Sequence, residues 1–442
     1  MQITPIPHPL NAIVRVPGSK SLTNRALLIA SLAKGTTRLT NALFSDDSRY
    51  FAKALQILGF DIQLDEVNCE ITVTGLGGKI PVDNVELFIG NAGTAARFLS
   101  AFLTLGNGEF VLDGDERMRE RPIGDLIFAL SQLGASIETS SSNCPPVKIK
   151  AFGLRGGKTS IAGNISSQFL SALLMVAPYA DTPVEIEVFT EPNSRPYIDM
   201  TLAIMRDFGV EIERNAYQHF SIPLTTYQLS RSIPVGPVPS LQSPISNSPP
   251  FSTYAIESDA SAASYFFAAP AICGGIVCVE NISRKSKQGD IAFLDILKQM
   301  GCAIKEEENF IEVTGTSSLQ GVDRDMRDIP DTAQTLAAIA PFASSPTRIR
   351  GIASARVKET DRVSATCNEL KRLGVQVEEH EDGMTIYPCR AFKPANIQTY
   401  NDHRMAMAFS LIGLRVDGVT IENPACVSKT FPNYFEVLDA LR

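Results

Sequence analysis

Six stretches of this chain are rich in Ala and Leu, and each follows a Gly, Asn or Asp turn and a Ser, Thr or charged residue. Ala and Leu favour helices, and the residues before them are typical of helix N-caps. The pattern therefore predicts six helices of one kind, within residues 19–35, 91–108, 164–180, 258–275, 330–345 and 401–418.

The turns before these helices keep a nearly constant spacing. Gly18, Gly90 and Gly163 are 72 and 73 residues apart, and the three Asp turns of the second half are 72 and 71 apart. A fixed period indicates repeated structural units. We expect three units in each half of the chain.

A second helix is expected in each of the first five units, where it ends in an apolar residue followed by Gly. Alternating segments such as 60–73 and 375–387 then predict strands joined by hairpin turns. Each unit has the order βαβαββ. The fold class is α/β, with two similar domains of three βαβαββ repeats.

One interval departs from the period, because 96 residues separate Gly163 from Asp259. The excess coincides with a Pro- and Ser-rich stretch at about 222–253. Such composition indicates a surface insertion. It is either a lengthened hairpin loop of the third repeat or the connection between the halves.

Bulk composition restricts the classes of partner. With 44% hydrophobic and 20% charged residues the chain can build a core, and its net charge of -8 argues against nucleic acid or an anionic membrane as a partner. The eight cysteines form no CxxC pair, and residues 1–13 lack the features of a signal peptide. We expect a cytoplasmic protein without a disulfide or zinc framework.

The uncharged run 260–279 has nearly the length of a membrane span, but Pro270, Gly274 and Gly275 divide it. We expect a buried helix followed by a strand.

Basic residues cluster at the openings of the repeats in an otherwise acidic chain. Free backbone N–H groups and the helix dipole at such openings favour anions, although single Ser, Thr, Asn or Asp residues there also act as simple N-caps. Arg25 and Arg97 lie in apolar runs and need anionic partners, either a bound anion or an internal Asp or Glu. The basic residues are Lys20, Arg25, Arg97, Arg121, Lys358, Arg362, Arg404 and Lys429.

Guanidinium groups match carboxylates and phosphates, so the cluster predicts small substrates that carry both groups. Asp331 and Glu359 lie beside it and are candidates for proton transfer, with an N-cap as the alternative role for Asp331. The chain has no GxxxxGK[ST], GxGxxG, HExxH or GxSxG motif of nucleotide or hydrolytic enzymes.

The chain resembles the 5-enolpyruvylshikimate-3-phosphate synthases from about Pro17 to its C-terminus. The strings RVKETDR and NDHRMAMA are the most specific together. The others, in family order, are PGSKSLTNRALLIA, GNAGTAARFL, ERPIGDL, SSQFLSALLM, SRPYIDMT, DIPDTAQT and SKTFPNYFE.

The resemblance implies an inside-out α/β barrel in each of two domains that close on substrates in the cleft between them. One domain is expected to span 19–255, and the other to join 1–18 to 256–442. The resemblance further implies an activity, the transfer of the enolpyruvyl group of phosphoenolpyruvate to the 5-hydroxyl of shikimate 3-phosphate by addition and elimination. No cofactor or metal is expected, and the family expectation is a monomer.

The family's site residues carry over to matching positions. For shikimate 3-phosphate they are Lys20, Ser21, Arg25, Ser166, Ser167, Gln168, Ser194, Tyr197, Asp331, Ser354 and Lys358. For phosphoenolpyruvate they are Lys20, Asn91, Gly93, Arg121, Gln168, Arg362, Arg404 and Lys429, with Thr94, Arg97 and His403 as further candidates.

The implied catalytic roles fall to three residues. Asp331 would accept the 5-hydroxyl proton, and Lys20 or Glu359 would exchange protons at C3. Gly93 would let phosphoenolpyruvate, or its competitor glyphosate, approach the backbone.

Two positions depart from the family pattern. Phe98 replaces a proline that is common after the Arg, which leaves the response to glyphosate open, and Ser354 stands where some relatives have Asn.

Three alternative functions are to be weighed against this one. The sister transferase for UDP-N-acetylglucosamine has a cysteine where this chain has Glu116 and a Lys-Asn start where it has SKS. A catalytically inactive relative that only binds phosphorylated metabolites or a protein partner would not need to retain Lys20, Asp331, Glu359 and Lys429. An RNA-end-processing enzyme would need a basic track that this composition lacks.

Overall fold

The computed structural model describes residues 1–229 and 251–442, and these divide into two compact units. Unit 1 comprises Met1–Pro17 and Ser258–Arg442, and unit 2 comprises Gly18–Glu257. Each unit has a hydrophobic core of its own. Residues 230–250, the main part of the expected insertion, lie outside the described residues.

The described residues of unit 2 form three four-stranded sheets, of order β13-β2-β4-β3, β5-β6-β8-β7 and β11-β12-β10-β9. Its helices are α1 (Lys20–Leu32), α2 (Asp46–Ile57), α3 (Gly93–Leu103), α4 (Gly124–Gln132), α5 (Ser167–Val176) and α6 (Arg195–Asp207). Its strands are β2 (Lys34–Thr40), β3 (Ile62–Asp65), β4 (Glu70–Leu76), β5 (Asn84–Phe88), β6 (Asn107–Asp113), β7 (Ser136–Glu138), β8 (Val147–Phe152), β9 (Gly157–Ile161), β10 (Val184–Val188), β11 (Glu213–Asn215), β12 (His219–Ile222) and β13 (Ser252–Ala255).

Unit 1 repeats this plan with sheets β1-β14-β16-β15, β17-β18-β20-β19 and β21-β22. Its helices are α7 (Ala260–Cys273), α8 (Phe293–Gln299), α9 (Ala333–Ile339), α10 (Arg362–Arg372), α11 (His403–Gly413) and α12 (Tyr434–Asp439). Its strands are β1 (Leu10–Arg15), β14 (Gly275–Glu280), β15 (Ala303–Glu306), β16 (Phe310–Thr314), β17 (Asp323–Asp325), β18 (Thr347–Arg350), β19 (Val377–His380), β20 (Gly383–Ile386), β21 (Ala395–Ile397) and β22 (Val419–Ile421).

The predicted α/β class and the βαβαββ order are confirmed in this arrangement. In the second repeat, β5 and β6 are parallel neighbours, while β6, β8 and β7 pair antiparallel. The sixth repeat differs: β22 is followed by a left-handed Asn423, the 3₁₀ helix η7 (Pro424–Lys429) and α12. Asn423 and Pro424 turn the chain where the other repeats form a hairpin.

Each second helix of the first five repeats stops where the sequence predicts. The Gly residues after α2, α4, α6, α8 and α10 all have positive φ, which a residue with a side chain rarely adopts, so they end these helices. They are Gly59, Gly134, Gly209, Gly301 and Gly374.

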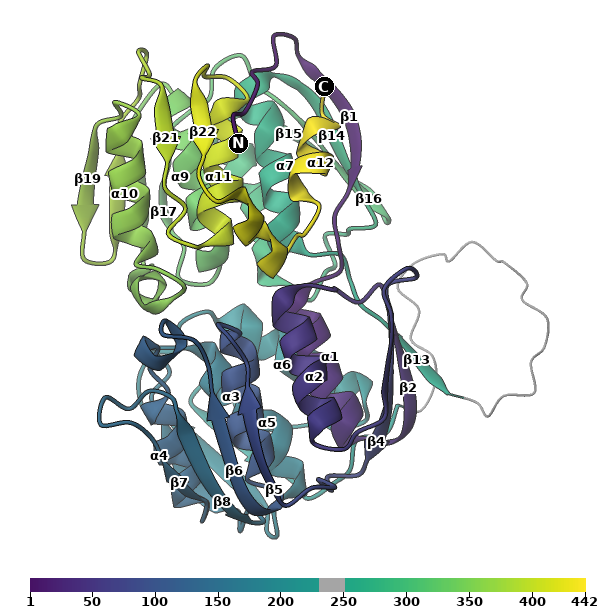
Figure 1. Cartoon of the computed structure of the whole chain (residues 1–442). Helices are drawn as coiled ribbons and strands as arrows, with labels where there is room; N and C mark the ends of the chain where they lie inside the picture. The colour runs from purple at the N-terminus through teal and green to yellow at the C-terminus, as the bar shows by residue number, and fades with distance from the viewer. Residues whose placement is uncertain (230–250) are drawn as a thin grey trace, which may run out of the picture. The chain divides into compact units, whose positions relative to one another are not determined.

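The first helix of every repeat lies inside its unit. In unit 1 every residue of α7, α9 and α11 is buried, and these helices pack against one another with the sheets outside them (Figure 1). In unit 2, α3 packs against α1 and α5 in the same way. Sheets around central helices form the expected inside-out barrel.

The helix and strand predicted within 260–279 are α7 and β14. Among the described residues, no helix combines the length and the apolar character needed to cross a membrane.

Two repeats receive their first strand from a distant part of the chain. β1 pairs in parallel with β14, and β13 pairs in parallel with β2. β12 and β13, on either side of residues 230–250, therefore belong to different sheets of unit 2.

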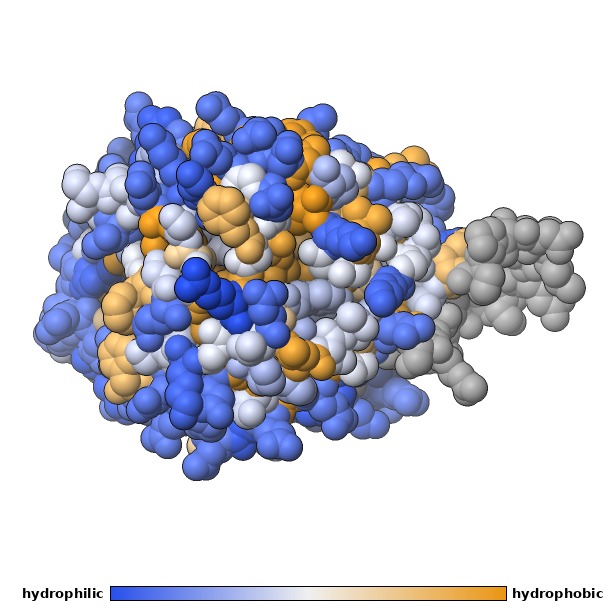
Figure 2. Space-filling model, turned by 90° about the horizontal axis from the view of Figure 1, so that it is seen from below, coloured by the Kyte–Doolittle hydropathy of each residue, from blue (hydrophilic) through white to orange (hydrophobic). Residues whose placement is uncertain are grey.

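The face seen in Figure 2 does not mark a site by its polarity. In the view of Figure 2, apolar side chains are scattered among hydrophilic ones. Phe88, Phe128, Phe152 and Phe189 of unit 2 are more than half exposed. The informative groups are instead charged side chains that the two units bury.

Candidate active site

Five of the predicted site residues form one ion cluster in unit 1. Asp331 lies in the 3₁₀ turn η4 (Pro330–Thr332) before α9, and its carboxylate accepts from Arg362 Nη1 (3.1 Å) and Arg404 Nη2 (2.7 Å). Glu359 Oε2 accepts from Arg362 Nη2 at 2.7 Å, and Glu359 Oε1 lies 3.3 Å from Lys429 Nζ. Asp331 is thus part of the cluster and not merely a helix cap.

Asp402 completes this cluster and was not among the predicted site residues. Its two oxygens accept from Arg362 Nε (2.7 Å) and Nη2 (3.3 Å), and Oδ1 also accepts from the backbone N–H of Arg404 as the N-cap of α11. The sequence signals for it were its place at the turn of a repeat and within the string NDHRMAMA.

The position of the arginines explains why they need these acids. Arg362 is the first residue of α10 and Arg404 the second of α11, where the helix dipole disfavours a cation. Burial lowers the pKa of Arg362, but Asp402, Glu359 and Asp331 outweigh burial and raise it above its ordinary value. Arg362 therefore stays charged although it is buried, in a cluster that pairs three cations with three carboxylates.

Three further predicted residues of unit 1 lie beside this cluster. Ser354 is in the 3₁₀ helix η6 (Ala353–Val357), which packs against η4, and Lys358 ends η6 next to Glu359. The ring of His403 is buried, and its Nδ1 lies 3.6 Å from Asp402 Oδ1. The His403 ring therefore lies next to Asp402, at the edge of the cluster.

In unit 2, the N-terminus of α1 carries two predicted cations. Lys20 Nζ lies 3.6 Å from Asp47 Oδ2, a partner that sequence reasoning missed. Arg25 is 1% exposed and donates to Thr201 Oγ1 (2.7 Å), Ser171 Oγ (3.3 Å) and the carbonyl oxygens of Ser21 and Tyr197.

The partners of Arg25 bear on one of the two alternatives left open above. Among the described residues no carboxylate pairs with it, so its partner is not an internal Asp or Glu. Burial lowers the pKa of Arg25 to about 10. A buried cation held by neutral groups keeps its field available to an anion.

The N-terminus of α3 gathers three of the predicted phosphoenolpyruvate residues of this unit. Arg121 Nη1 donates to the side chain (2.9 Å) and carbonyl (3.2 Å) of Asn91. A Cβ on Gly93 would lie 2.3 Å from Arg121 Nη2. The missing side chain of Gly93 thus makes room for Arg121, a role that the sequence did not indicate.

Two more helix starts of unit 2 carry predicted residues. Ser166 caps α5, and Gln168 of α5 donates to Thr94 Oγ1 of α3 at 3.3 Å. Ser194, in a left-handed conformation, precedes α6 with Tyr197 in its first turn. Arg97 lies deeper in α3 and donates to the carbonyl oxygens of Gly93 and Pro122.

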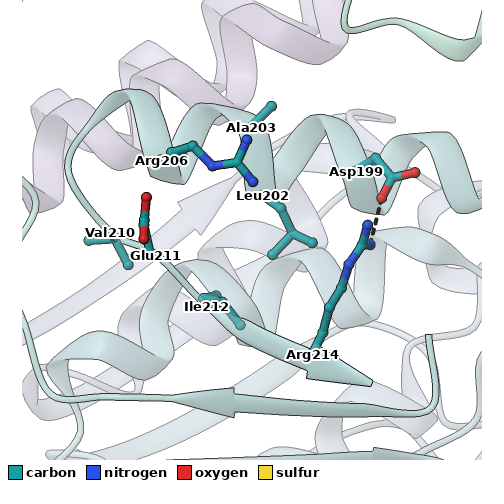
Figure 3. Close-up of a pocket in the computed structure, with 8 residues that line it drawn as sticks. All are labelled: Asp199, Leu202, Ala203, Arg206, Val210, Glu211, Ile212 and Arg214. Carbon is teal, nitrogen blue, oxygen red and sulfur yellow. Dashed lines mark hydrogen bonds and ion pairs between the residues drawn. The ribbon is translucent and has the colours of Figure 1, made fainter. Parts of the chain in front are cut away.

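A surface pocket elsewhere in unit 2 contains none of these residues. It measures 520 Å³ and lies between α6 and the segment that leads into β11 (Figure 3). Arg214 and Asp199 form an ion pair of 2.6 Å at one side of it. Because the buried cations lie elsewhere, the pocket is not the predicted site.

Comparison with known proteins decides the family. The model of the family described as EPSP synthase (3-phosphoshikimate 1-carboxyvinyltransferase) matches residues 5–438. The chain belongs to the EPSP synthase family.

Its relatives and structural neighbours agree with this assignment. A 3-phosphoshikimate 1-carboxyvinyltransferase of Nostoc punctiforme is 48% identical over 437 residues, which cover 98% of this chain and 97% of the relative. One from a Marinomonas species is 48% identical over 433 residues, with the same coverage of both chains. The solved EPSP synthase of Acinetobacter baumannii has a TM-score of 0.78 at 26% identity, over 99% of this chain and 97% of the other.

Proposed function

We propose that this chain transfers the enolpyruvyl group of phosphoenolpyruvate to the 5-hydroxyl of shikimate 3-phosphate and releases phosphate. It is a 3-phosphoshikimate 1-carboxyvinyltransferase of aromatic amino acid biosynthesis, as its family and its relatives are named. The observation that carries the chemistry is the cluster in unit 1, where Arg362, Arg404 and Lys429 share Asp331 and Glu359.

The residues of unit 2 bind mainly shikimate 3-phosphate in this proposal. The starts of α1, α5 and α6 present hydroxyl groups and backbone N–H groups beside Lys20 and Arg25, which suits a phosphate and a ring with hydroxyls. The ligands from this unit are Lys20, Ser21, Arg25, Ser166, Ser167, Gln168, Ser194 and Tyr197. Asp331, Ser354 and Lys358 come from unit 1.

Phosphoenolpyruvate carries one carboxylate and one phosphate, and each suits an arginine fork. We assign Arg362, Arg404 and Lys429 of unit 1 to it, and Lys20, Asn91, Gly93, Arg121 and Gln168 of unit 2. Thr94, Arg97 and His403 support neighbouring groups.

The reaction follows from where protons can go. Asp331, which accepts hydrogen bonds from two arginines, takes the proton of the 5-hydroxyl of shikimate 3-phosphate as the hydroxyl oxygen attacks C2 of phosphoenolpyruvate. At the same time C3 of phosphoenolpyruvate receives a proton from Glu359 or Lys20. The tetrahedral intermediate then loses phosphate as the proton at C3 leaves. Fixed cations stabilise the phosphate and carboxylate charge throughout, and no cofactor takes part.

We further infer that the chain works as a monomer in the cytoplasm. The expectation comes from the family resemblance, and the free cysteines of the described residues suit a reducing compartment. Size-exclusion chromatography with light scattering tests the monomer, since a mass near 96 kDa, about twice the 47.9 kDa of one chain, would contradict it.

Replacing Asp331 tests the chemical proposal. Asp331→Asn keeps the shape of the side chain but removes the proton acceptor, and Asp328→Asn, an Asp in the same loop, serves as the control. Phosphate release should fall about 10²- to 10⁴-fold for Asp331→Asn only. Full turnover would remove Asp331 from the mechanism.

A further inference from the structure

The buried guanidinium of Arg25 lies over the ring of Phe98. The distance from Arg25 Cζ to the ring centroid is 5.3 Å, within the range of roughly 6 Å for a cation–π contact. Phe98 belongs to α3 and is fully buried. Phe51 of α2 packs against the ring of Phe98, with 6.4 Å between the two ring centroids.

Arg25 joins four helices at one point of unit 2. It belongs to α1, lies over Phe98 of α3, and donates to Ser171 of α5 and Thr201 of α6. It also donates to the carbonyl oxygens of Ser21 and Tyr197. Its guanidinium therefore bridges the first turns of α1 and α6.

Arg25 of unit 2 and Arg362 of unit 1 have partners of different charge. Arg362 of unit 1 contacts three carboxylates, whereas the acceptors of Arg25 are hydroxyls and carbonyls. Among the described residues no carboxylate offsets the charge of Arg25, and its printed acceptors are neutral groups. An aromatic face attracts the cation through its quadrupole but cannot take the place of an anion as its partner.

We propose that Phe98 is a positioning residue for shikimate 3-phosphate, because its ring holds the Arg25 guanidinium that orders the starts of α1 and α6. This inference rests on the proposed function for the identity of the ligand. It does not require Phe98 to touch the substrate. Loss of the contact should therefore weaken shikimate 3-phosphate binding and leave phosphoenolpyruvate binding nearly unchanged.

The test replaces Phe98 in the full chain by mono-, di- and trifluorinated phenylalanine, which weakens the quadrupole while keeping the ring's shape. Phe102 receives the same series as the matched control, because it is a buried Phe one turn further along α3 that packs against Phe60 at 5.7 Å. Phe98→Leu and Phe102→Leu extend both series by removing the ring.

We expect the KM for shikimate 3-phosphate to rise with each fluorine at position 98, by about tenfold in all. The kcat and the KM for phosphoenolpyruvate should stay within about twofold, and the series at Phe102 should be flat. A flat series at position 98, or equal changes at both positions, would overturn the inference.

A second readout separates this inference from the proposed function. Thermal midpoints should fall stepwise in the Phe98 series only, whether or not the chain turns over shikimate 3-phosphate. If the unsubstituted chain does not turn over shikimate 3-phosphate, the proposed function is contradicted. If the chain is active but its thermal unfolding midpoint does not change with fluorination of Phe98, the contact between Phe98 and Arg25 is contradicted.

Discussion

Asp402 offers a quantitative test of the ion cluster in unit 1. It is fully buried, contacts Arg362 at 2.7 and 3.3 Å, and caps α11 through the N–H of Arg404 at 2.9 Å. Asp402→Asn keeps a good N-cap, since Asn and Asp cap equally well. It removes the charge, however, and turns an amide N–H₂ group or a weaker acceptor toward Arg362.

The expected loss follows from this geometry. Breaking a buried ion pair costs about 3–5 kcal/mol, and the lower end applies because Arg362 keeps Asp331 and Glu359. About 1 kcal/mol shifts the midpoint of a domain of roughly this size by about 2–4 °C. The transition of unit 1 should therefore fall by roughly 6–12 °C.

Thermal unfolding followed by circular dichroism measures this shift, and Asp361→Asn is its control. Asp361 caps the neighbouring α10 and pairs with Arg356 at 2.8 Å, but its side chain is 39% exposed. An exposed pair contributes about 1 kcal/mol or less, so its shift should be small. Equal shifts for the two variants would refute the claim that burial makes the Asp402 contact strong.

Three more outcomes are expected. Asp331→Ala should keep shikimate 3-phosphate binding within about tenfold yet lose most turnover, about 10²-fold or more, and calorimetry beside a phosphate assay measures both. Gly93→Ala should raise the KM for phosphoenolpyruvate because its Cβ displaces Arg121, while the midpoint barely moves; an unchanged KM would contradict the clash. Burial lowers the pKa of Arg25 to about 10, so the cation is present at neutral pH and is lost as the pH rises through that value. The KM for shikimate 3-phosphate should therefore rise between pH 8 and about 10, and a flat profile would refute this.

Local signals account for most of the fold that the sequence predicts. The helix starts and the Gly residues that end helices depend on neighbours a few residues away, and Gly209 and Gly374 end α6 and α10 as expected. Long-range pairing left no such signal. The four residues of β13 pair in parallel with β2, which lies more than 200 residues earlier in the chain. Neither strand has a sequence feature that indicates which strand it pairs with.

The candidate site shows the same limit. The cations were predictable because they cluster at the openings of the repeats, and because the charges of Arg25 and Arg97 in apolar runs are costly. Their partners were not, because Asp47, Asp402 and Thr201 come near Lys20, Arg362 and Arg25 only in the folded chain. The sequence also could not reveal that an aromatic ring, and not an acid, faces Arg25.

Phosphate release from phosphoenolpyruvate tests the central claim most directly. It is measured with shikimate 3-phosphate, with UDP-N-acetylglucosamine as the control acceptor, and without an acceptor. The account predicts release only with shikimate 3-phosphate. Release only with the sugar nucleotide, or release with neither acceptor from a chain shown to be folded, would contradict it.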